Sequence, residues 1–281
     1  MRGPVRDLIA FGKHLSERNR VFAKASTEQL GPGSMNTLAD RLHPRGGQRM
    51  RITAVRQDAP DVFTYRLEPP EGAQVAPFRA GQYVAVEALV EQNPISRPYS
   101  IATPPQTALD GNYYEITIKR KADGYLAAAG IDDWSVGTQL HCSDPEGFFT
   151  YEPLRDSTTL VCLAGGTGIT PFRAIIPDVL ANHPETQVQL LYGINTPEEE
   201  LYGAAFRDLA ERYGDRFRYV LIVAAETGFI TAKLIDEHTA GCEDPTIFIC
   251  GPEAMQDHLT AELAPRGLAR RRVRRENFGT A

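Results

Sequence analysis

The sequence has few of the residues that would mark a metal protein or a disulfide-rich secreted protein. Its 281 residues include four cysteines, Cys142, Cys162, Cys242 and Cys250, which form no CxxC pair and no closely spaced set. A zinc site, or an iron–sulfur cluster held by this chain alone, is therefore not expected. A disulfide framework is not expected either in a chain of this size.

Long apolar runs are also missing. No run is long enough to cross a bilayer, and the N-terminal residues carry charges throughout, without the apolar core of a secretory signal. We therefore expect no membrane span and a cytoplasmic protein. The net charge of −6 gives no general attraction to nucleic acids or anionic membranes. Hydrophobic residues make up 42% of the chain, enough for the cores of two domains of ordinary size.

The distribution of apolar residues predicts three parts. Residues 1–48 have a mostly helical pattern and are expected to form an arm packed against the body. Residues 49–152 contain short runs rich in Val, Ile, Thr and Tyr between Gly, Pro and Asp, which predict a small antiparallel barrel or sandwich. Residues 153–281 alternate strand-like and helix-like runs, which predict a parallel sheet with helices on both faces.

The last part also gives bounds for each expected element. Strands are expected at 158–166, 187–195, 217–225, 246–252 and 270–278, and helices at 172–183, 197–214 and 253–267. Pro177 is expected to strain or shorten the first helix, whereas Pro197 would start the second. Residues 152–157 are the expected hinge between the two domains.

The stretch "RPYSIA" places a charge, a ring and a hydroxyl close together, as Arg97, Tyr99 and Ser100. A ligand with a phosphate, a flat ring system and a polar ring nitrogen could use all three. Taken singly, the same residues could be a surface charge, an aromatic at the edge of the core and a turn residue.

Two further stretches follow predicted buried strands. In "LAGGTGITP" (163–171), glycines let the backbone approach a ligand, and the following helix start favours phosphate. Its spacing is neither GxGxxG nor a Walker loop, and a tight strand-to-helix turn would explain it equally well. In "FICGPEAM" (248–255), Cys250 falls at the strand end where open parallel sheets bind ligands. Alone, it is better explained as a small buried hydrophobe.

Together, the order and context of these three motifs resemble the ferredoxin–NADP reductase superfamily, in which an antiparallel flavin-binding β-barrel precedes a Rossmann-like nicotinamide-binding domain. The resemblance covers about residues 49–281 and is strongest to the reductase components that feed oxygenases and other iron–sulfur partners. Some of those carry a [2Fe–2S] domain on the same chain.

The resemblance implies an enzyme. NADH or NADPH would donate hydride to bound FAD, with FMN less expected, and single electrons would pass to a protein acceptor. That acceptor would be a ferredoxin or a [2Fe–2S] domain on another chain. The alternative is a degenerate relative that holds flavin or nucleotide only to regulate or scaffold a complex.

The resemblance also assigns the flavin contacts. Arg97 would bind a flavin phosphate, Tyr99 would lie on the isoalloxazine, and Ser100 would hydrogen-bond the ring nitrogen that accepts hydride. Pro98 belongs to the same motif, and Lys119 in "TIKR" is a weaker candidate. A second phosphate loop would consist of Gly124, Tyr125, Leu126 and Ala127. Ala127 stands where the family has a hydroxyl, so only backbone N–H groups could bind there.

The nicotinamide contacts follow from the other two motifs. One wall would be formed by Gly165, Gly166, Thr167, Gly168, Thr170 and Pro171, and the other by Cys250, Gly251, Pro252 and Glu253. Cys250 would lie near the carbon that donates hydride. Ser100, Cys250 and Glu276 are the expected catalytic residues, and Phe278 would cover the flavin face that nicotinamide uses.

Two charged stretches bear on specificity and on partners. After the second parallel strand, neutral Asn195 is followed by Glu198–Glu200, which offer no cation to a 2′-phosphate, so NADH is favoured over NADPH. The run 269–277 carries five arginines around Val273. It is expected to be an edge strand or a surface segment, and its arginines either protect a strand edge from pairing or form a docking patch for an acidic electron acceptor.

Overall fold

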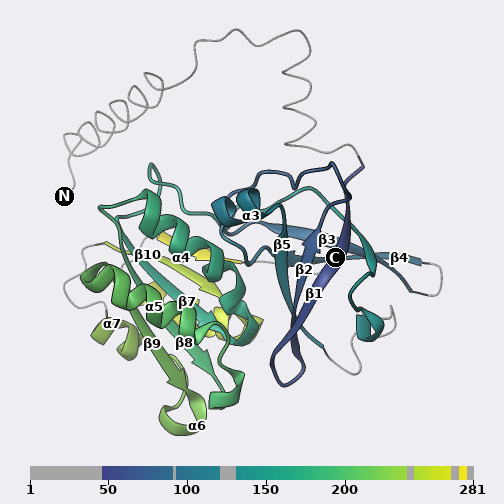
Figure 1. The fold of residues 1–281 in the computed structure, drawn as a ribbon. Helices are drawn as coiled ribbons and strands as arrows, with labels where there is room; N and C mark the ends of the chain where they lie inside the picture. Colours follow the sequence, from purple (N-terminus) through teal and green to yellow (C-terminus); the bar gives the residue numbers. More distant parts are fainter. Residues whose placement is uncertain (1–45, 91–92, 121–130, 239–243, 267–271, 277–281) are drawn as a thin grey trace, which may run out of the picture.

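The fold is taken from a computed structural model that describes residues 46–90, 93–120, 131–238, 244–266 and 272–276. The expected helical arm, the phosphate loop at 124–127 and Phe278 lie outside these residues. Two sheets lie side by side, one built from the N-terminal half and one from the C-terminal half of the described chain (Figure 1).

The first sheet has six antiparallel strands in the order β4-β3-β6-β1-β2-β5. Their bounds are β1 Gln48–Ala59, β2 Val62–Glu68, β3 Tyr83–Val90, β4 Asn93–Ser100, β5 Tyr114–Lys119 and β6 Gln139–Cys142. A bridge between Ile101 and Ile116 brings the end of β4 to β5, so the two edge strands approach each other. Alternate residues such as Ile52, Leu67 and Val84 are buried, as the pattern predicted for a barrel.

The second sheet has five parallel strands in the order β11-β10-β7-β8-β9. Their bounds are β7 Thr159–Gly165, β8 Gln187–Ile194, β9 Phe217–Val223, β10 Thr246–Cys250 and β11 Val273–Arg275. The α-helices of the described chain are α3 Pro105–Gly111, α4 Thr170–Asn182, α5 Gly203–Tyr213, α6 Ala224–Thr227, α7 Ala232–His238 and α8 Glu253–Leu263. Short 3-10 turns are η1 Ile131–Asp133, η2 Gly166–Ile169, η3 Pro197–Glu199, η4 Gly214–Arg216 and η5 Ala264–Arg266.

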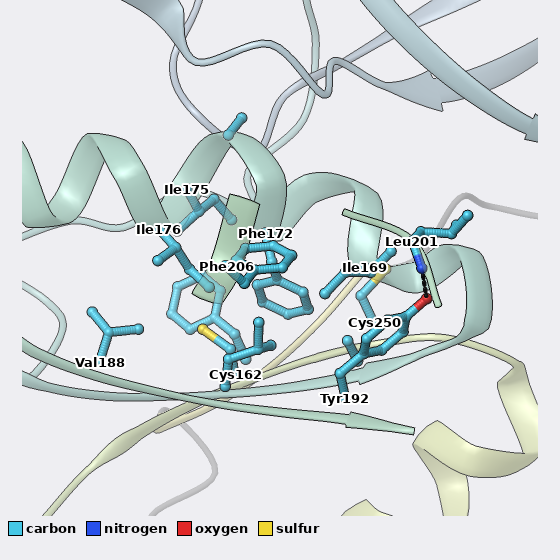
Figure 2. Packing of buried hydrophobic residues seen from close by; sticks show 14 of the residues in the cluster. Cys162, Ile169, Phe172, Ile175, Ile176, Val188, Tyr192, Leu201, Phe206 and Cys250 are labelled. Carbon is cyan, nitrogen blue, oxygen red and sulfur yellow. Dashed lines mark hydrogen bonds between the residues drawn. The ribbon is translucent and has the colours of Figure 1, made fainter. Parts of the chain in front are cut away.

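Helices cover both faces of the parallel sheet, as predicted. One core cluster includes Cys162 of β7, Phe172 of α4 and Phe206 of α5, and Figure 2 shows these side chains in the layer between the helices and the sheet. The opposite face buries Leu163 of β7 and Leu259 of α8 in a second cluster. Because both faces are covered, β7 and β10 are buried and apolar over nearly their whole length rather than alternating.

Three details differ from the sequence predictions. Pro177 lies inside α4 without shortening it, because buried Ile176, Val179 and Leu180 hold both sides of the proline in the core. The helix expected at 197–214 is divided into η3 and α5, since Tyr202 adopts a left-handed backbone with φ 59°. The sequence also gave no signal for α3, α6 and α7.

The described residues contain no helix that is both long enough and apolar enough to cross a membrane. Within the same residues, no three His, Cys, Asp or Glu side chains lie close enough together to hold a metal ion.

Candidate functional site

The carboxyl ends of β7, β10 and β11 meet at one edge of the parallel sheet, beside the barrel. The η2 turn, which follows β7, contacts β5 of the barrel. A cavity of about 700 Å³ lies between Tyr83 and Phe148 of the barrel region and Arg274, Arg275 and Glu276 at the C-terminal strand. Residues of both halves therefore surround one open space.

The two glycine-containing loops interlock at this edge. A Cβ on Gly168 would overlap the carbonyl oxygen of Cys250, and a Cβ on Gly165 would overlap the sulfur of Met255. Gly166 differs, since it has φ 51° and no described atom within 4 Å of its Cβ position. The backbone is therefore open to a ligand at Gly166, whereas the same expectation for Gly165 and Gly168 is corrected, because protein atoms occupy the space beside those two glycines. The neighbouring Thr170 donates its hydroxyl to the carbonyl of Thr167 at 2.6 Å and closes the turn.

The "RPYS" residues end β4, which pairs with β3 so that Ser100 lies opposite Tyr83. The Ser100 side chain is buried, and its hydroxyl has no hydrogen-bond partner among the described residues. Tyr99 is partly buried against the barrel core, and this burial raises the pKa of its phenol. The Arg97 guanidinium donates to the carbonyl of Ser96 at 2.8 Å.

An unpartnered buried hydroxyl is uncommon, because an unpaired polar group costs free energy in a protein interior. A ring nitrogen of a flavin would supply the partner that Ser100 lacks. Together with the open backbone at Gly166, this hydroxyl fits a flavin and a nucleotide phosphate at the junction of the two sheets.

Cys250, the last residue of β10, is 1% exposed and lies in the core cluster with Ile169 and Tyr192 (Figure 2). Burial raises the pKa of its thiol well above the usual value, and the charge of Glu276 adds to this. The side chain is therefore a neutral thiol at the edge of the sheet, packed as a small hydrophobe.

Replacing Cys250 with alanine separates its two possible roles. If the thiol lines the nicotinamide site, the variant should keep its flavin but NADH should reduce that flavin about tenfold or more slowly. The reason is that closely packed reacting groups tolerate little displacement. The matched control is Cys162→Ala, which removes an equally buried thiol from the interior of β7. Stopped-flow reduction and melting curves compare the two variants, and equal rates in both would leave Cys250 a core residue only.

Glu276 follows β11 directly and is 5% exposed. Its backbone N–H donates to the carbonyl of Ile249 at 3.0 Å, while one carboxylate oxygen has no partner among the described residues. Burial raises the pKa of this carboxyl to about 7. The side chain lines the cavity opposite Tyr83, so it can hold or release a proton near neutral pH beside the barrel.

The raised pKa makes stability depend on pH. The folded protein binds the Glu276 proton more tightly than the unfolded chain does, so the free energy of unfolding should fall as pH rises from about 4.5 to 7. The expected loss over this window is on the order of 3 kcal/mol relative to Glu276→Gln, which cannot ionise. Melting temperatures of both proteins from pH 4 to 8 test this, and parallel curves would contradict it.

The structure brings Lys119 and Asn195 together through Glu199. The Asn195 backbone N–H and side-chain amide each donate to one Glu199 oxygen at 3.0 Å, and the Lys119 ammonium lies 3.6 Å from the other. The expectation that no cation lies near Asn195 is therefore corrected, because a barrel lysine reaches this loop from the other sheet. Glu200 is also engaged, with Arg207 at 2.7 Å.

Of the two predicted alternatives, an edge strand or a surface segment, the structure shows an edge strand, and the arginines in and just before β11 are paired within the chain. Arg272 binds Asp244 at 2.7 Å, Arg274 binds Asp156 at 2.9 Å, and Arg275 binds Asp257 at 2.7 Å. This pairing does not support a docking patch built from these three residues, because each guanidinium already has a carboxylate partner. Arg270 and Arg271 lie outside the described residues.

Sequence reasoning missed three residues that shape this region. Asp156, in the expected hinge, has a fully buried side chain and binds two arginines. Gln256 is a buried amide in the first turn of α8. The Tyr202 hydroxyl hydrogen-bonds the hydroxyl of Thr117 on β5, joining the halves of the molecule. Among these, only Asp156 had a signal, as an acid next to Arg155 in the hinge sequence "LRDS".

A barrel with an unpartnered serine at the end of β4, joined to a parallel sheet with an open glycine turn, fits a protein that binds a flavin and a nicotinamide nucleotide. Residues 49–151 match the oxidoreductase FAD-binding domain, and residues 162–260 match the oxidoreductase NAD-binding domain. The chain belongs to the ferredoxin–NADP reductase superfamily, and it is a flavin oxidoreductase of the ferredoxin reductase type.

Similar proteins are named as reductases of different proteins. The chain is 28% identical over 224 residues to NADH-cytochrome b5 reductase 1 of Debaryomyces hansenii, covering 76% of this chain and 77% of that protein. It is 32% identical over 202 residues to the ferredoxin reductase component of a 3-ketosteroid-9-alpha-monooxygenase from Mycobacterium tuberculosis, covering 70% of this chain and 54% of that protein. The crystal structure of an Amycolatopsis cytochrome P450 reductase superposes with a TM-score of 0.70 and 26% identity, covering 84% and 71%.

Proposed function

We propose that the protein is a reductase that takes hydride from NADH onto bound FAD and delivers single electrons to a protein acceptor. The observation that carries this proposal is the buried, unpartnered hydroxyl of Ser100, a residue that pairs across β3 and β4 with Tyr83 of the cavity between the two halves. When bound, the flavin would accept two electrons from the nicotinamide as hydride and release them one at a time.

The chain's own residues bind and orient the reactants. Ser100 would donate its hydroxyl to the flavin ring nitrogen, and Arg97 would pair with a flavin phosphate. The backbone N–H groups of the turn at Gly166 would face the nucleotide pyrophosphate. Cys250 would exclude water from the nicotinamide, and Glu276 would hold a proton at the cavity between the halves. FAD is proposed over FMN because "RPYSIAT" and "TIKR" are more like the FAD-binding relatives.

The acceptor is proposed to be a ferredoxin or a [2Fe–2S] domain on another chain. Support comes from the mycobacterial relative, which is named as a ferredoxin reductase component, although this chain spans about half of that protein. The absence of a cluster from this chain, the domain boundaries at 48 and 152 and the cytoplasmic location remain predictions.

The test begins with the protein as purified. We expect a yellow protein whose released flavin has the mass of FAD and whose colour bleaches when NADH is added without a partner. Ser100→Ala should keep the flavin and slow bleaching on the order of 100-fold, the usual effect of removing one donor from a reacting centre. A colourless protein that takes up no FAD, or a yellow protein that NADH does not bleach, would support a scaffold role instead.

NADH is expected to be the better donor. Glu199 and Glu200 surround the loop at Asn195, and the nearby Lys119 is already paired with Glu199, so a 2′-phosphate would have to displace a carboxylate. The loss of one such partly exposed ion pair corresponds to about twofold to fivefold in kcat/KM. Steady-state rates with both donors at one ionic strength measure the ratio, and equal use of NADPH would show that Lys119 or another cation reaches the phosphate.

A further inference from the structure

One buried side-chain amide outside the motifs joins the ends of β10 and β11. Gln256 lies in the first turn of α8, after the "CGP" turn, and is 6% exposed. The sequence offers no reason to single it out, because a glutamine in the first turn of a helix is ordinary.

Both polar atoms of this side chain form hydrogen bonds. Its Nε2 donates to the carbonyl of Gly251 at 2.9 Å and to the carbonyl of Glu276 at 3.1 Å. Its Oε1 accepts from the Nε of Arg275 at 3.4 Å. The amide thus bonds the residue that follows Cys250 and the backbone of Glu276 at the same time, and among the described residues no other side chain bonds both.

Few other hydrogen bonds hold the backbone of Glu276 in position. β11 pairs only with β10, and the Glu276 N–H donates to Ile249 across that pairing. The next peptide group is held by Gln256 at the Glu276 carbonyl. One hydrogen bond therefore holds the N–H of Glu276 and one holds its carbonyl. The direction of the Glu276 carboxylate depends on both bonds. The Gly251 bond fixes the turn after Cys250 in the same way.

We infer that Gln256 is a positioning residue, which holds the Cys250 turn and Glu276 in one fixed arrangement at the hydride-transfer site. The inference deepens the proposed function and rests on it. A displacement of about 1 Å at a reacting centre can cost on the order of 100-fold in rate, so a residue that touches neither reactant can still control the chemical step. Gln256 then acts through backbone carbonyls on two neighbouring candidate catalytic residues.

The test compares two variants of the full-length flavin-loaded protein. Gln256→Met keeps the volume and the helix but removes both donors. Leu259→Met is the matched control, since Leu259 is fully buried on the same helix but contacts neither turn through a hydrogen bond. Stopped-flow reduction gives the limiting rate and the apparent Kd for NADH. Mass spectrometry after labelling with iodoacetamide gives the alkylation rate of Cys250, a readout that does not require activity.

We expect Gln256→Met to lower the limiting rate about tenfold or more, to change the Kd for NADH less than about threefold, and to speed Cys250 alkylation several-fold. Leu259→Met should match wild type in all three measurements. An unchanged limiting rate and alkylation rate in Gln256→Met, or equal losses in both variants, would overturn the inference. If NADH does not reduce the wild-type protein, the proposed function fails, and the alkylation comparison still decides whether Gln256 holds the turn.

Discussion

Replacing Gly168 with alanine is expected to remove most NADH-dependent flavin reduction. The new Cβ would overlap the carbonyl oxygen of Cys250 and lie 2.5 Å from its carbonyl carbon and 2.6 Å from the α-carbon of Gly251. All three are backbone atoms, which cannot move aside as the end of a flexible side chain can. The turn after β7 and the turn after β10 must therefore separate.

The consequence is larger for activity than for stability. Overpacking of this kind typically costs about 1–3 kcal/mol, which a folded protein can tolerate. Separating the two walls of the nicotinamide site, however, should slow hydride transfer on the order of 100-fold. Stopped-flow reduction by NADH and a melting curve measure both effects on the same preparation.

Gly193 provides the control at the same edge of the sheet. Its Cβ would meet the Ile230 side chain at 3.3 Å, a contact that a small shift of that side chain relieves. Gly193→Ala should therefore reduce flavin at nearly the wild-type rate. If Gly168→Ala also reduces flavin at nearly the wild-type rate, the turn after β7 and the turn after β10 are not in the close contact that the structure shows.

The prediction of the fold from sequence succeeded where periodicity carries the information. Buried parallel strands appear as continuous apolar runs, such as "LVCLAG", and half-buried antiparallel strands as alternating ones, such as "MRITAV". It failed at Pro177, where local propensity predicted a shorter helix and burial of the flanking residues maintains it. It also failed at Tyr202, because a left-handed non-glycine residue has no sequence signature.

The candidate site shows the same division. Ser100, Gly168 and Cys250 could be proposed from the sequence because their motifs have a fixed order along the chain. Gln256 and Asp156 could not, since their hydrogen bonds to Glu276 and Arg274 join segments that are separate in sequence. The arginine run was interpreted as either edge protection or a docking patch, and only the positions of Asp156, Asp244 and Asp257 show that its described members are paired.

Replacing Asp156 with alanine is expected to have the largest effect on stability. The Asp156 side chain is fully buried and accepts from the Arg274 guanidinium at 2.9 and 3.1 Å and from Arg155 at 2.8 Å. It also accepts from the Glu152 backbone N–H at 2.9 Å. Removing the carboxylate leaves Arg274, whose side chain is 20% exposed, without its partner. Breaking a buried pair in this way typically costs about 3–5 kcal/mol.

Asp257→Ala is the matched control, because it removes the partner of the adjacent arginine on the same strand. The Asp257 side chain is 62% exposed, so its ion pair with Arg275 should contribute less than about 1 kcal/mol. Melting temperatures should therefore fall by roughly 10 °C for Asp156→Ala and by no more than a few degrees for Asp257→Ala.

Asp156 is expected to affect the site as well as the fold, because β11 is an edge strand with a single neighbour. Val273 anchors one face of β11 in the core, and Arg274 anchors the other to Asp156 in the segment that joins the two sheets. Losing that anchor should loosen Glu276, two residues further on, and slow flavin reduction at temperatures well below the melting transition. A double variant, Asp156→Ala with Arg274→Met, should recover much of the lost stability because no charge is left unpaired at β11. If the double variant is no more stable than Asp156→Ala, the bond to Arg274 is not what makes Asp156 important, and its contacts with Arg155 and Glu152 must account for the loss.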